Sequence, residues 1–169
     1  GVVQVVSTSR AFAALKDDGS VVTWGEPGSA GAPSDVAVLG ELAFGVKALF
    51  TTRDAMAALK EDGSVVTWGH SSHGGDRTAV AGQLSSGVVS IYSNERAFVA
   101  VKADGSLVKW GWNGSGGGPD QGLGTTTSRI YSNGESFVAV DHEGGLYSWG
   151  NQSFGGGGNN HTGKSICSP

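Results

Sequence analysis

One 16-residue phrase is repeated four times along this 169-residue chain. It reads RAFAALKDDGSVVTWG at 10–25, DAMAALKEDGSVVTWG at 54–69, RAFVAVKADGSLVKWG at 96–111 and ESFVAVDHEGGLYSWG at 135–150. The tryptophans of these phrases, Trp24, Trp68, Trp110 and Trp149, follow one another at intervals of 44, 42 and 39 residues. A period near 40 built from short apolar runs is typical of a β-propeller or a solenoid, and the long 3.6-residue periodicity of a helical array is absent. The chain is therefore expected to stack one β-unit four times.

Each unit is expected to contain three strands. In the first unit these are GVVQVVST, AFAALK and SVVTWG. The second and third strands are separated by an acidic residue and a glycine, which is the signature of a tight turn with positive φ. The turn glycines are Gly19, Gly63, Gly105 and Gly144. The sequence thus predicts an all-β fold of β-propeller-type blades, in which four repeats form a partial or open propeller arc.

The second strand is apolar on both faces, which indicates a sheet packed between two others. The large apolar residues Phe12, Met56, Phe98 and Phe137 are expected to fill the gaps between blades, and the repeated tryptophans to cover the outer part of each blade. Trp68 has a unit on either side, whereas Trp149 belongs to the last unit. Trp149 is therefore expected to contribute less to stability.

The chain is interpreted as a single repeat domain spanning 1–169. Its units cover about 1–44, 45–86, 87–125 and 126–160, and 161–169 form a C-terminal tail. A glycine-rich loop follows each Trp-Gly pair. In the first two units the loop leads into VAVLGEL and AVAGQL, which are compatible with a fourth strand or with a short helical turn.

The phrase AALKDDGSVVTWG and the looser WGWNGSGGGPDQGLG resemble the repeat of the regulator of chromosome condensation family. The resemblance recurs four times and covers nearly the whole chain. It implies a β-propeller, usually of seven four-stranded blades, so four units imply either an arc from a longer array or an incomplete propeller that a partner completes. Members of that family act as a nucleotide exchange factor for a small GTPase, as modules of ubiquitin ligases, as an ultraviolet photoreceptor and as a β-lactamase inhibitor. Most of these activities depend on binding a protein through propeller loops.

Composition narrows the range of partners. The net charge is −4 and the lysines lie beside acidic residues, so no nucleic-acid partner is expected. No apolar run approaches the ~18 residues of a membrane-spanning helix, so no membrane span is expected. Cys167 is the only cysteine, which excludes an internal disulfide and favours an intracellular setting, cytosolic or organellar, over secretion.

Signals of catalysis are weak. No G-x-S-x-G nucleophile elbow is present. His70, His73 and Asp76 have the residue types of a zinc site, but their spacing in a polar loop favours an ordinary loop. The glycine-rich segment GSGGGP is not followed by a predicted helix that would bind phosphate. The sequence therefore predicts no enzyme, no cofactor and no metal.

The function predicted is that of a non-catalytic protein–protein interaction module, or a structural subunit of a larger assembly, which binds through propeller loops. The alternative is a regulator of an enzyme, either a nucleotide exchange factor for a small GTPase or a protein inhibitor. The candidate protein-contact residues, all in loops after a Trp-Gly pair, are Trp112, Asn113, Phe154, His70 and His73. Tryptophan is enriched in binding hot spots, although Trp112 is also compatible with packing over the rim of its own blade.

Overall fold

The structure, a computed structural model, describes residues 1–31, 33, 35–118 and 127–157. In these residues the chain forms four three-stranded antiparallel sheets, each with its strands in chain order and none closed into a barrel. Blade 1 contains β1 (Val2–Ser7), β2 (Ala11–Lys16) and β3 (Val21–Gly25), and blade 2 contains β4 (Val46–Thr51), β5 (Ala55–Lys60) and β6 (Val65–Gly69). Blade 3 contains β7 (Val88–Ser93), β8 (Ala97–Lys102) and β9 (Leu107–Gly111), and blade 4 contains β10 (Thr127–Ser132), β11 (Ser136–Asp141) and β12 (Leu146–Gly150).

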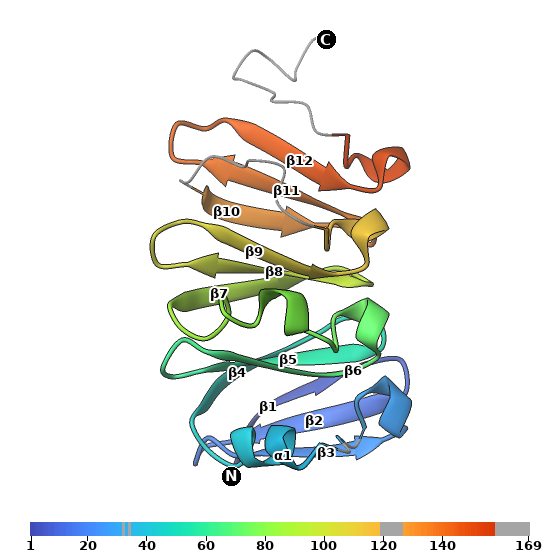
Figure 1. Ribbon diagram of the computed structural model, residues 1–169, viewed down its shortest axis with the longest axis vertical. Coiled ribbons are helices and arrows are strands. Elements are labelled where there is room, and N and C mark those ends of the chain that lie inside the picture. The colour runs from blue at the N-terminus through green and yellow to red at the C-terminus, as the bar shows by residue number, and fades with distance from the viewer. Residues whose placement is uncertain (32, 34, 119–126, 158–169) are drawn as a thin grey trace.

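The four blades stack face to face in chain order, from blade 1 in blue to blade 4 in orange and red (Figure 1). Three apolar clusters fill the three gaps between consecutive blades. The strand order within each sheet and the stacking of the four sheets confirm the predicted all-β fold of open propeller blades.

The turns between the second and third strands are built as the sequence predicts. Gly19, Gly63, Gly105 and Gly144 have φ values of 77°, 78°, 82° and 84°. Residues with a Cβ rarely adopt such positive φ values, so glycine is favoured at these positions. In blade 1 the Asp18 carboxylate accepts hydrogen bonds from the amide and the hydroxyl of Ser20, at 2.9 and 2.6 Å, which closes the turn.

Alternation along the second strand gives each blade two different faces. On β5, Ala55, Ala57 and Leu59 pack toward blade 3, whereas Met56 and Ala58 pack toward blade 1. Met56, the large residue near the start of the strand, therefore faces the preceding blade, and the alanines on either side of it face the next blade. Met56, Phe98 and Phe137 are fully buried in these gaps.

The repeated tryptophan lies on the same face as this large residue. Phe98 and Phe137 are stacked on Trp110 and Trp149, with ring centroids 5.2 and 5.5 Å apart. Each tryptophan therefore packs against the preceding blade. The sequence argument placed the missing neighbour beside Trp149, but Trp149 is 8% exposed and Trp24 is 46% exposed. The tryptophan that lacks a neighbouring blade is Trp24.

The first two units carry short helical segments, and no fourth strand, after their third strand. The segment VAVLGEL contains the helix α1 (Val36–Glu41), which Asp35 caps by accepting a hydrogen bond from the amide of Ala37. AVAGQL begins in the 3₁₀ turn η3 (Thr78–Val80). Each segment then accepts one backbone hydrogen bond from the third strand of its blade. The Val21 amide donates to the Leu42 carbonyl and the Val65 amide to the Leu84 carbonyl, both at 2.9 Å.

The blades of the first two units thus have three strands, not the four that the family resemblance implies. The corresponding segment of the third unit, 119–126, lies outside the described residues, as do the tail 161–169 and Cys167. Among the described residues, no helix is long and apolar enough to cross a membrane.

Candidate functional site: the turn rim

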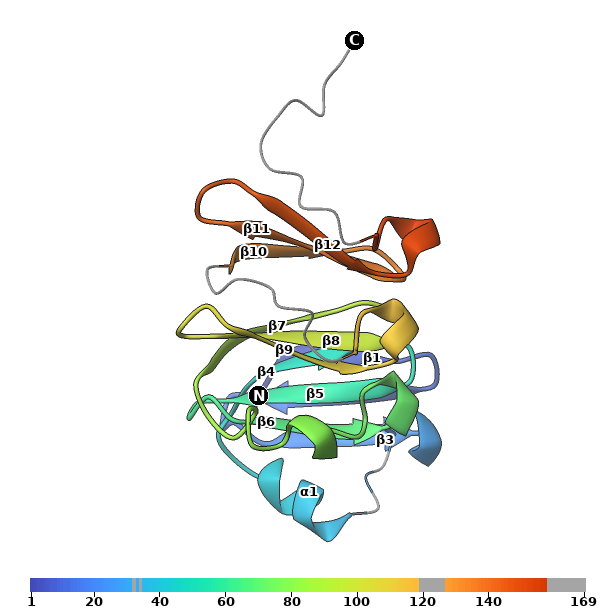
Figure 2. The ribbon, with the colours of Figure 1, turned by 45° about the horizontal axis from the view of Figure 1, so that its top comes forward.

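Four 3₁₀ turns, one after each Trp-Gly pair, lie along one side of the stack, on the right in Figure 1 and again in Figure 2. We call this side the turn rim. It consists of η1 (Pro27–Ser29), η2 (Ser71–His73), η4 (Asn113–Ser115) and η5 (Gln152–Phe154). The turns end at Ala30, Gly74, Gly116 and Gly155, which are all left-handed.

Each turn is fixed to its own blade by the residue that follows the first strand. The side chains of Thr8, Thr52, Asn94 and Asn133 donate to the carbonyls of Ser29, His73, Ser115 and Phe154, at 2.7–2.9 Å. The turns are therefore held on a rigid framework, as positioned binding loops usually are.

The rim brings the predicted contact residues to one side of the molecule. Trp112 and His70 precede their turns at the same repeat position, and both are exposed. The exposed fraction of Trp112 is 48%, and its indole nitrogen lies close above Gly114 of its own turn. Half of the ring is thus covered by its own loop and half faces solvent. Asn113 is exposed beside it.

Phe154 lies at the end of the rim, with an exposed fraction of 56%. It shares the last position of its turn with Ser29, His73 and Ser115. Ser29 and Ser115 donate to the carboxylates of Asp54 and Glu135 in the next blade. The Phe154 position is therefore where a following blade packs, which the sequence alone did not indicate.

His73 is mostly buried, unlike the other predicted contacts. Its ring stacks on His70 with centroids 4.6 Å apart, and its Nδ1 lies 3.2 Å from Oδ2 of Asp54. Desolvation, assisted by the charges of His70 and Arg96, lowers the pKa of His73 against the opposing effect of Asp54. Among the described residues, no three side chains of histidine, cysteine, aspartate or glutamate come together as metal ligands.

A row of alternating charges along the rim was missed in the sequence. The residue before the second strand is Arg10, Asp54, Arg96 and Glu135 in the four units. Arg10 lies 3.8 Å from Asp54, and Arg96 lies 3.9 Å from Glu135. Burial tends to raise the pKa of Asp54, but the Ser9 hydroxyl, His73 and two arginines outweigh it and lower that pKa. Alignment of the four phrases would have revealed the alternation.

The lowered pKa of His73 predicts a pH dependence of stability. In the unfolded chain this histidine has its ordinary pKa of 6.5, so as the pH falls through that value the unfolded state takes up protons before the folded state does. Stability should therefore decrease from about pH 7.5 to about pH 5.5, while Asp54 stays ionised in this window. In thermal melts, His73→Gln should reduce this decrease. An equal decrease in the variant would assign it to other groups.

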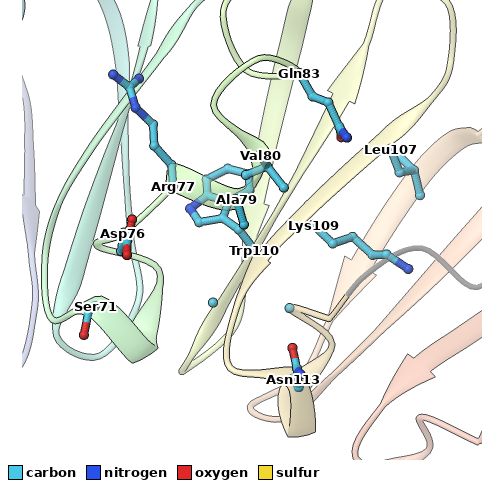
Figure 3. A pocket seen from close by; sticks show the side chains of 12 residues that line it. Ser71, Asp76, Arg77, Ala79, Val80, Gln83, Leu107, Lys109, Trp110 and Asn113 are labelled. Carbon is cyan, nitrogen blue, oxygen red and sulfur yellow. The ribbon is translucent and has the colours of Figure 1, made fainter.

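A cavity of about 500 Å³ opens between blade 2 and blade 3, beside the rim (Figure 3). Its lining residues are Ser71, Asp76, Arg77, Ala79, Val80, Gln83, Leu107, Lys109, Trp110, Gly111, Asn113 and Gly117. Arg77 is held by Glu41 at 3.1 Å, and Lys109 lies over the Trp149 ring, 5.4 Å from its centroid. The wall is apolar at Leu107 and Val80 and charged at Asp76. The cavity meets the rim at Ser71 and Asn113.

The fold is shared with known proteins, although neither a protein-family model nor a curated protein matches the sequence. Prp20p from Saccharomyces cerevisiae superposes with a TM-score of 0.60 at 20% identity, over 88% of this chain and 43% of that one. The same yeast protein, RCC1 (Prp20), in its complex with Kap60 superposes with a TM-score of 0.59 at 19% identity, over 89% of this chain and 44% of that one. Human WBSCR16 superposes with a TM-score of 0.60 at 19% identity, over 88% of this chain and 47% of that one.

The chain thus spans less than half the length of these proteins. At these identities the likeness concerns the fold. The fold of this chain is that of the regulator of chromosome condensation repeat, in the form of four open propeller blades.

Proposed function

We propose that this chain is a non-catalytic protein-interaction module that binds a protein partner through the turn rim, with Trp112 as the anchor. The observation that carries the proposal is the half-exposed indole of Trp112 on a turn fixed to its blade. Exposed tryptophans of this kind often become the buried centre of an interface. His70 and Asn113 flank it on the same rim.

The blade faces inside the stack leave little for recognition, because they pack against one another. The cavity beside Asn113 offers room for a partner side chain next to the Trp112 anchor. The net charge of −4 favours a protein partner over a nucleic acid. Solved relatives of this fold support the class of function, since Prp20p is described with binding properties to Gsp1p and histones, and RCC1 (Prp20) was solved bound to Kap60.

The proposal predicts a large loss of partner affinity in Trp112→Ala. Truncation of a hot-spot tryptophan costs about 2 kcal/mol or more, which corresponds to a dissociation constant raised about 30-fold. Phe44→Ala is the matched control: Phe44 is 66% exposed and lies under the Lys60 ammonium, away from the rim turns. Its affinity for the partner should equal that of the wild type.

The partner is identified by affinity capture from the native source with three baits, followed by mass spectrometry and titration calorimetry. A protein retained by the wild type and by Phe44→Ala, and lost by Trp112→Ala, is the expected result. Thermal melts of the three baits provide the folding control. Retention of the same protein by Trp112→Ala, together with a lowered melting temperature, would make Trp112 a packing residue and refute the rim site.

A further inference from the structure

The cavity between blade 2 and blade 3 combines an apolar wall with a polar mouth (Figure 3). Leu107 and Trp110 form the buried part of the wall, with exposed fractions of 9% and 3%, and Val80 adds a half-buried side chain. The exposed polar residues that line the cavity are Ser71, Asp76, Gln83 and Asn113. Binding sites commonly pair apolar walls with a few polar groups that orient the ligand. The cavity therefore suits a ligand that is itself partly apolar and partly polar.

The charges around the cavity are unbalanced in favour of a cationic ligand. In the described part of the chain, Asp76 is the only acidic side chain that lines the cavity. The two basic side chains of the lining are engaged elsewhere: Arg77 bonds to Glu41 at 3.1 Å, and Lys109, 7% exposed, lies over the Trp149 ring. Figure 3 shows both of them directed away from Asp76. The carboxylate therefore faces the cavity without a cation of its own chain beside it.

Asp76 is also held in one orientation. Its Oδ1 accepts hydrogen bonds from the amide and the hydroxyl of Thr78, at 2.8 and 2.6 Å. These two bonds outweigh desolvation and lower the pKa of Asp76, so the carboxylate is ionised at neutral pH. Its Oδ2 has no hydrogen-bond partner among the described residues. One oxygen thus fixes the carboxylate, and the other is left to accept from a ligand.

We propose that this cavity binds an arginine side chain of the protein partner, with the guanidinium on Asp76 and the methylene groups against Val80 and Leu107. The inference rests on the proposed function and adds the chemistry of one partner residue, which enters beside the Trp112 anchor. Arginine is a side chain with an apolar stem and a charged head, and it buries the stem while the head stays with polar groups. The net charge of −4 also attracts a basic partner segment.

Arginine fits this mouth better than lysine does. A guanidinium carries five N–H donors and no acceptor, so it can bond to Asp76 and to the side-chain oxygens of Gln83 and Asn113 together. The ammonium of lysine is a compact, strongly hydrated charge that meets fewer acceptors at once.

The test is a nuclear magnetic resonance titration of the isotope-labelled protein with N-acetyl-L-arginine N-methylamide. The corresponding lysine compound and the citrulline compound, which replaces the guanidinium by a neutral urea of the same shape, are titrated in parallel. The reporters are the backbone amides of Asp76 and Gly117 and the indole Nε1–H of Trp110, which donates to the Gly74 carbonyl at 3.0 Å.

Two matched variants isolate the carboxylate. Asp76→Asn keeps an oxygen acceptor for Thr78 and removes the charge. Asp62→Asn is the control, because the Asp62 Oδ1 accepts from the amide and the hydroxyl of Ser64 in the same way, at 2.9 and 2.7 Å, and Asp62 does not line the cavity. Unchanged amide signals away from each substitution show that the variants are folded.

The arginine compound should shift the three reporters in a saturable manner in the wild type and equally in Asp62→Asn. Asp76→Asn should raise its dissociation constant about tenfold or more, as expected for the loss of a hydrogen bond to a charged group. The lysine compound should bind more weakly, and the citrulline compound more weakly still. The absence of saturable shifts in the wild type would overturn the proposal, as would equal binding by Asp76→Asn or equally tight binding of the lysine or citrulline compound.

The titration contains no partner protein, so its outcome is separate from that of the capture experiment. Failure of the titration, with partner capture still dependent on Trp112, would refute the arginine site and leave the rim site standing. The reverse result, arginine-specific shifts together with capture that does not depend on Trp112, would refute the rim anchor alone.

Discussion

Replacement of Trp68 by alanine is expected to lower the free energy of unfolding by about 3–5 kcal/mol. The indole is 4% exposed in the gap between blades 1 and 2, where it packs with Met56 and Ala58. Its removal leaves a cavity that rigid sheets on both sides close poorly. It also takes the Nε1 donor from the Ala30 carbonyl, 3.0 Å away. Chemical denaturation followed by circular dichroism measures the effect.

The other repeat tryptophans provide the matched series for this measurement. Trp149→Ala should cost somewhat less, because the indole is buried but its nitrogen has no hydrogen-bond partner among the described residues. Trp24→Ala should cost least, since the ring is 46% exposed. A Trp24 variant as destabilised as Trp68→Ala would contradict the conclusion that these tryptophans are stabilised by packing against the preceding blade.

Gly75→Ala is expected to destabilise the protein by about 3 kcal/mol, at the upper end of the usual cost of overpacking. A Cβ at this position would lie 2.3 Å from the Gly69 carbonyl oxygen and 2.5 Å from its carbon. Both atoms belong to the backbone of β6, so relief requires the whole turn to move. The Gly75 amide also donates to the His70 carbonyl at 3.0 Å, and that bond would be strained.

Gly82→Ala is the control for this prediction, because a Cβ there meets no atom within 4 Å. It should be neutral or slightly stabilising, as alanine reduces the entropy of the unfolded chain. Denaturation midpoints of both variants are compared with the wild type. Equal midpoints for Gly75→Ala and Gly82→Ala would show that the η2 turn adjusts without cost, and the rim would then be less rigid than its hydrogen bonds indicate.

The sequence by itself determined the repeated blade. The acidic-residue–glycine turn, the short apolar runs and the Trp-Gly ending are local signals, and local backbone preferences are enough to form a hairpin from them. The sequence also placed Trp112, Asn113, His70 and Phe154 in loops of the same kind, since each lies within four residues after a Trp-Gly pair.

Only the tertiary structure decided which neighbour each face meets. A strand of period two has two faces, but its sequence does not say which face packs on the preceding blade, so the exposed end was assigned to Trp149 instead of Trp24. The segment VAVLGEL was compatible with a strand or a helical turn, and in the structure it forms the helix Val36–Glu41, followed by one backbone hydrogen bond from the Val21 amide to the Leu42 carbonyl. His73 became a buried residue because blade 3 packs over it and Asp54 lies 3.2 Å away. Contacts between units therefore decided these features, since residues about 40 positions apart in the chain lie side by side only after the blades have stacked.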